Sequence, residues 1–71
     1  MSVKEIEQQI IKLAHEFAQK YGSEVLELTE DELIAYITPL LSLDELSVFR
    51  FYKSKMLYIF LKTVKEDLSK S

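Results

Sequence analysis

Apolar residues in the first third of the chain recur at steps of three and four, the spacing that places side chains on one side of an α-helix. They are Val3, Ile6, Ile10, Leu13, Ala14, Phe17 and Tyr21. Ser2 and Glu5 have the S-x-x-E pattern of a capping box at the start of this run. Gly22 follows the run and predicts its end, because glycine tolerates the left-handed conformation there. The pattern therefore predicts a helix over residues 3–21.

The middle of the chain begins with a segment whose pattern leaves two structures open. Residues 23–28 carry three apolar side chains, which fit either one short helical turn or an extended connector tucked under the bundle. Thr29 and Glu32 then form a second capping box, which predicts the start of a helix over residues 30–38. Pro39 ends or kinks that helix, because proline lacks a backbone N–H and disfavours helical geometry at the preceding residue.

A third capping box, Ser42 and Glu45, precedes a long stretch without glycine or proline. It predicts a helix over residues 43–68, about 39 Å long at about 1.5 Å per residue. The fold class predicted is therefore all-α, a small three-helix bundle with a long C-terminal helix. The length of 71 residues fits a single helical domain over residues 1–71.

The composition is that of a folded, globular protein, with 48% hydrophobic and 30% charged residues. A chain this short buries a small core, so small domains commonly gain support from disulfides, metals or oligomeric contacts. Cysteine is absent, which excludes a disulfide and a thiolate metal site and favours oligomerisation or docking on a larger protein. Charges interrupt residues 2–21, and the apolar run 56–61 is too short to span a bilayer. We therefore expect a cytoplasmic protein that does not enter a membrane.

The residues that commonly carry catalysis or hold cofactors are scarce. His15 is the one histidine, with no second histidine or cysteine to complete a zinc site, and its place within a helix favours a surface or boundary position. The single glycine excludes a phosphate-binding loop and a dinucleotide fingerprint. We expect no catalytic residue, no cofactor-binding residue and no metal ligand, so the protein is not expected to be an enzyme.

Charge is segregated along the chain, although the net charge is only −3. Residues 24–45 contain no base and seven acids, whereas residues 50–65 contain no acid and five bases. One explanation is structural, because acids at helix starts complement the helix dipole and an acidic second helix can pair with a basic third helix. The other explanation is that the segregated charges face a partner.

The predicted C-terminal helix carries basic and aromatic side chains along one side, away from its apolar side. The candidate partner-binding residues are Phe51, Lys55, Tyr58, Lys62 and Lys65, at steps of four, three, four and three. Lysines can meet phosphates or an acidic protein, and aromatic rings add apolar contact or base stacking. The alternative is that Phe51 and Tyr58 cover the first helix or the 23–28 connector, so the pattern leaves open whether they are core or interface.

These observations favour a non-catalytic protein-interaction module, an accessory subunit or adaptor that docks on a larger assembly or self-associates. The expected partner is a protein or a second copy of the chain. The alternative is a nucleic-acid-binding protein, or an accessory subunit of a replication or transcription machine, that uses the basic and aromatic side of the C-terminal helix. A helix-turn-helix reader is disfavoured, because Asp44 and Glu45 would open its recognition helix and repel phosphates.

Overall fold

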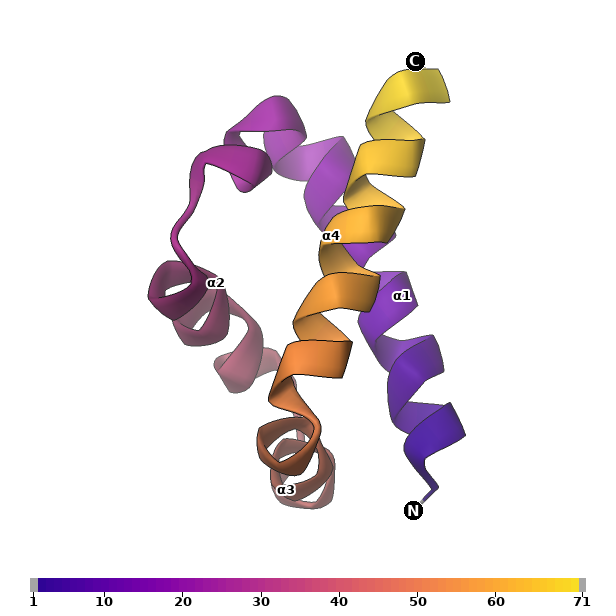
Figure 1. Cartoon of the computed structure of the whole chain (residues 1–71), viewed down its shortest axis with the longest axis vertical. Coiled ribbons are helices and arrows are strands. Elements are labelled where there is room, and N and C mark those ends of the chain that lie inside the picture. Colours follow the sequence, from indigo (N-terminus) through magenta and orange to yellow (C-terminus); the bar gives the residue numbers. More distant parts are fainter. Residues whose placement is uncertain (1, 71) are drawn as a thin grey trace.

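The computed structural model describes residues 2–70, which are helical apart from short connections, with no strand in that range. The prediction of an all-α fold is therefore confirmed. Two long helices, two shorter helices and two 3₁₀ turns follow one another along the chain (Figure 1). Their bounds are α1 Val3–Tyr21, η1 Gly22–Glu27, α2 Glu30–Ile37, η2 Thr38–Leu40, α3 Leu43–Phe51 and α4 Lys53–Lys70.

Side-chain caps fix the starts of three helices where the sequence predicted them. Complete capping boxes form at Thr29 with Glu32 and at Ser42 with Glu45, each with both reciprocal hydrogen bonds. At Ser2 only half of the expected box is present, because its hydroxyl accepts from the Glu5 backbone N–H at 3.2 Å without the reciprocal bond. Each cap satisfies backbone donors that the helix itself leaves unpaired.

The core lies mainly between α1 and α4, which are the most closely packed pair of elements and run parallel (Figure 1). α2 descends on the other side of α4, and α3 crosses the base of the molecule. Every helix contributes buried apolar side chains, as does η1. These are Ile6, Ile10, Leu13, Ala14, Phe17, Ala18, Val25, Leu33, Ile37, Phe49, Met56, Leu57, Phe60 and Val64.

Gly22 ends α1 and begins the segment for which the sequence allowed two structures. This residue has φ 62° and ψ −143°, so its φ is positive as expected but its ψ is not that of the left-handed helix. Its backbone N–H donates to the Ala18 carbonyl, and the chain continues as the 3₁₀ helix η1. Val25 of η1 is buried, which anchors the turn to the core.

Pro39 ends α2 as the sequence predicted. α2 stops at Ile37, and Thr38–Leu40 form the 3₁₀ turn η2 with the proline in its first positions. A 3₁₀ turn accommodates proline near its start because the fixed φ suits that position and no backbone donor is needed there. The chain then changes direction before α3 (Figure 1).

The helix predicted over residues 43–68 is divided at Tyr52 into α3 and α4. Tyr52 has φ −109° and ψ 32°, outside the helical region, and α3 runs across the direction of α4 (Figure 1). One unbroken helix would have turned Arg50 and Lys53 toward the core, where unpaired charge is costly. With the break, Arg50 is exposed and the Lys53 ammonium lies 3.8 Å from a Glu30 carboxylate oxygen.

Candidate partner-binding surfaces

Four of the five candidate residues lie on one side of α4. Lys55, Tyr58, Lys62 and Lys65 are all exposed, and Tyr58 has 65% of its surface accessible. The opposite side of α4 is the core side, with Met56, Leu57, Phe60 and Val64 buried. We call these four exposed residues the α4 face. The helical periodicity that separates the two sides is the one that the sequence predicted.

The bases of the α4 face differ in how far their charge is compensated. The Lys55 ammonium lies 3.4 Å from a carboxylate oxygen of Glu7 in α1. The Lys62 ammonium lies 6.0 Å from the centre of the Tyr58 ring, within the range of a cation–π contact. Neither Lys62 nor Lys65 forms an ion pair within residues 2–70. The positive charge without an ion-pair partner is therefore that of Lys62, near the Tyr58 ring, and of Lys65, further along α4.

Phe51 does not belong to the α4 face. It is the last residue of α3, and the break at Tyr52 separates it from the line of side chains along α4. Its ring packs against the Tyr52 ring, with the centres 4.9 Å apart, and 81% of its surface remains exposed. Both aromatic side chains that the sequence left undecided, Phe51 and Tyr58, are thus exposed in this chain rather than buried in its core.

The acidic segment 24–45 is explained in part by its own helices. Glu32 and Glu45 complete the two capping boxes, and the hydrogen bonds with Thr29 lower the pKa of Glu32. Glu30 pairs with Lys53, which is the expected contact between the acidic and basic parts of the chain. The acids outside these contacts have no basic partner within residues 2–70. They are Glu24, Glu27, Asp31 and Asp44.

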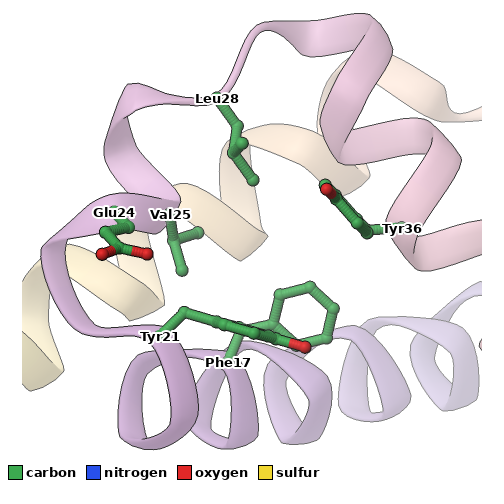
Figure 2. Close-up of a pocket in the computed structure, with 6 residues that line it drawn as sticks. All are labelled: Phe17, Tyr21, Glu24, Val25, Leu28 and Tyr36. Carbon is green, nitrogen blue, oxygen red and sulfur yellow. The ribbon is translucent and has the colours of Figure 1, made fainter.

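A hollow between α1, η1 and α2 was not predicted from the sequence. It has a volume of about 210 Å³ and is lined by Phe17, Tyr21, Glu24, Val25, Leu28 and Tyr36. Figure 2 shows Leu28 and Tyr36 across the hollow from Phe17 and Tyr21. Tyr36 and Tyr21 remain 56% and 44% exposed, so the lining is open to solvent. We call this hollow the tyrosine pocket.

The tyrosine pocket exists because α2 does not pack closely on α1 at this level. η1 and Leu28 connect the two helices along the chain and form part of the lining between them. The Phe17 and Tyr21 rings, which meet edge to face with their centres 5.5 Å apart, form the α1 side of the lining. Sequence reasoning placed Phe17 and Tyr21 on the apolar side of the first helix, which is correct, but spacing along one helix says nothing of its distance from the next. No sequence pattern marks the hollow, because Tyr21 and Tyr36 belong to different helices and are both exposed.

His15 links the two long helices. Its Nδ1 lies 2.5 Å from an Asp67 carboxylate oxygen of α4, and about half of the His15 side chain is exposed. No group of three histidine, cysteine, aspartate or glutamate residues within 2–70 is arranged to hold a metal ion. None of the helices in the same range is both long and apolar enough to cross a membrane.

Comparisons with protein-family models, with curated proteins and with solved structures found no match to this chain.

Proposed function

We propose that this protein is a non-catalytic protein-interaction module that docks on a protein partner through the α4 face. The observation that carries the proposal is the exposure of Tyr58 on the side of α4 opposite a fully packed core side. An exposed tyrosine adds little to the stability of the fold. Tyrosine is, however, enriched among the interface residues that dominate binding energy. Lys62 and Lys65 beside it favour an acidic patch on the partner.

A protein partner is favoured over nucleic acid by the number of free bases. Lys55 is paired with Glu7, which leaves Lys62 and Lys65 on the α4 face. Strong binding to a duplex commonly neutralises about 6–10 phosphates, and the chain carries a net charge of −3. An acidic protein surface needs fewer bases, because apolar contact with the Tyr58 ring contributes to affinity independently of charge.

The test is affinity capture from native-host extract with charge-reversed variants. Lys62→Glu combined with Lys65→Glu should release the captured partner, since two attractive charges become repulsive. Lys4→Glu combined with Lys12→Glu is the matched control, because both lysines are exposed on α1 and the change in net charge is the same. Circular dichroism should show equal helix content in all three proteins. Equal capture by both double variants would contradict the proposal.

A gel-shift assay tests the nucleic-acid alternative with the same proteins. A generic duplex and a single strand are mixed with the wild type at low salt, where charge-driven binding is strongest. We expect no shift of either. A shift that the wild type gives and the Lys62→Glu, Lys65→Glu variant loses would assign the α4 face to nucleic acid instead.

A further inference from the structure

The tyrosine pocket has the size of a site for one aromatic side chain. Its volume is about 210 Å³, whereas sites for cofactors and drug-sized ligands are commonly about 300–1,000 Å³. An apolar cavity of about 150 Å³ in another protein binds benzene. The walls are the rings of Phe17, Tyr21 and Tyr36 with two aliphatic side chains, so a single planar ring fits the shape and the chemistry of the hollow.

The pocket also has a polar contact for such a ring. Glu24 is part of the lining, and Figure 2 shows its carboxylate next to Val25. Glu24 has no ion pair within residues 2–70. A carboxylate can accept a hydrogen bond from a phenol and attract a nearby ammonium. One base also lies near the pocket: the Lys20 ammonium on α1 is 5.3 Å from the centre of the Tyr21 ring.

The α4 face presents the complementary set of groups. Tyr58 is an exposed phenol, and Lys62 lies one helical turn further along with its ammonium near the ring. No residue of α4 lines the tyrosine pocket, so the ring and the pocket are separate surfaces of one molecule. One surface is apolar with an unpaired acid, and the other is aromatic with unpaired bases.

We infer that the tyrosine pocket binds Tyr58 of a second copy of this chain, so that copies associate head to tail. This inference rests on the proposed docking role of the α4 face and names its occupant. In the contact, the Tyr58 ring enters the hollow between Phe17 and Tyr36, its hydroxyl donates to Glu24, and Lys62 approaches the same carboxylate. The segregated acidic and basic segments of the sequence then face one another between copies.

The geometry determines what assemblies form. A contact between two different patches leaves one free pocket and one free α4 face at the ends of a pair, so association continues until a ring closes or a filament grows. One ring in one small pocket buries less area than stable interfaces, which bury about 1,200–2,000 Å². The contact is therefore weak, with a dissociation constant in the micromolar to millimolar range, so it is sought at protein concentrations from about 10 µM to about 1 mM.

Sedimentation across this concentration range tests the inference with two variants that damage different halves of the contact. Tyr58→Ala removes the inserted ring, and Glu24→Lys reverses the charge of the pocket. Both side chains are exposed, so the fold should be retained. The wild type should increase in average mass with concentration, whereas each variant alone should stay monomeric. Phe51→Ala and Glu16→Lys, which change an exposed ring on α3 and an exposed acid on α1, should associate as the wild type does.

Mixing the two variants gives the decisive result. The Glu24→Lys protein has an intact α4 face, and the Tyr58→Ala protein has an intact pocket, so an equimolar mixture should form a 1:1 pair that grows no further. A wild type that stays monomeric, or a mixture that stays monomeric while the wild type associates, would overturn the inference. If the wild type is monomeric and the Lys62→Glu, Lys65→Glu variant still loses its captured partner, the proposed function stands without self-association.

Discussion

Substitutions on the buried side and on the exposed side of α4 should reduce stability by very different amounts. Phe60 is fully buried, and its ring meets the Phe17 ring edge to face with the centres 5.2 Å apart. Replacing a buried phenylalanine by alanine costs about 3–5 kcal/mol, from lost burial and from the cavity left behind. Tyr58 lies two residues earlier on the exposed side, where substitutions usually change stability by about 0.5 kcal/mol or less. Phe60→Ala and Tyr58→Ala should therefore differ strongly.

The expected loss is large compared with the whole stability of the domain. At about 0.05–0.15 kcal/mol per residue, a chain of this length has a free energy of unfolding of about 4–11 kcal/mol. Phe60→Ala should therefore remove about a quarter or more of this free energy of unfolding. For a domain of this size each kcal/mol shifts the melting temperature by about 4–8 °C, so a decrease of at least about 12 °C is expected.

Thermal and urea unfolding followed by circular dichroism measure both variants. Tyr58→Ala should unfold within a few degrees of the wild type, and Phe60→Ala should unfold far earlier or be partly unfolded at 25 °C. Similar melting temperatures for the two variants would refute the assignment of α4's core and outer sides, and with it the basis for a docking face. A large loss from Tyr58→Ala alone would show that its ring supports the fold.

Three further changes test local features of the fold. Gly22→Ala should cost about 1–3 kcal/mol, because the residue has a positive φ that alanine adopts only with strain; asparagine should not restore stability, since ψ is −143°. Pro39→Ala should cost about 0.4–1 kcal/mol by freeing the unfolded chain, with helix content unchanged in circular dichroism. Glu32 has a lowered pKa because its carboxylate accepts a hydrogen bond from the Thr29 backbone N–H. Its contribution to the free energy of unfolding is therefore present above the ordinary carboxyl pKa and is lost as the pH falls through the lowered pKa. When unfolding is measured from about pH 7 to about pH 2, the free energy of unfolding should decrease less at acid pH for Glu32→Gln than for the wild type.

Local chemistry made the helix starts and the exposed side of α4 predictable. The N-cap serine or threonine accepts from the backbone N–H three residues further on, a contact within one helical turn, so Thr29 and Ser42 correctly predicted where their helices begin. The side of α4 that carries Tyr58 followed from periodicity within one helix. These features depend on residues within a few positions of one another, which the sequence contains directly.

The break at Tyr52 and the tyrosine pocket depend on tertiary structure instead. No glycine or proline marks the break, and its effect is to keep Arg50 out of the core and to bring Lys53 to Glu30 of another helix. That break moved Phe51 away from the line of side chains predicted with Tyr58. The pocket likewise depends on how far η1 separates α2 from α1, a distance that no periodicity within a single helix encodes.

Photocrosslinking in the native host shows whether the α4 face contacts protein. A photoreactive phenylalanine analogue is placed at position 58 and, as the control, at position 12, an exposed site on α1. After irradiation, denaturing gels with and without nuclease treatment separate protein adducts from nucleic-acid adducts. We expect discrete, nuclease-resistant protein adducts, second copies of this chain among them, from position 58 and none of them from position 12. Nuclease-sensitive adducts at position 58, or the same adducts from both positions, would contradict this expectation.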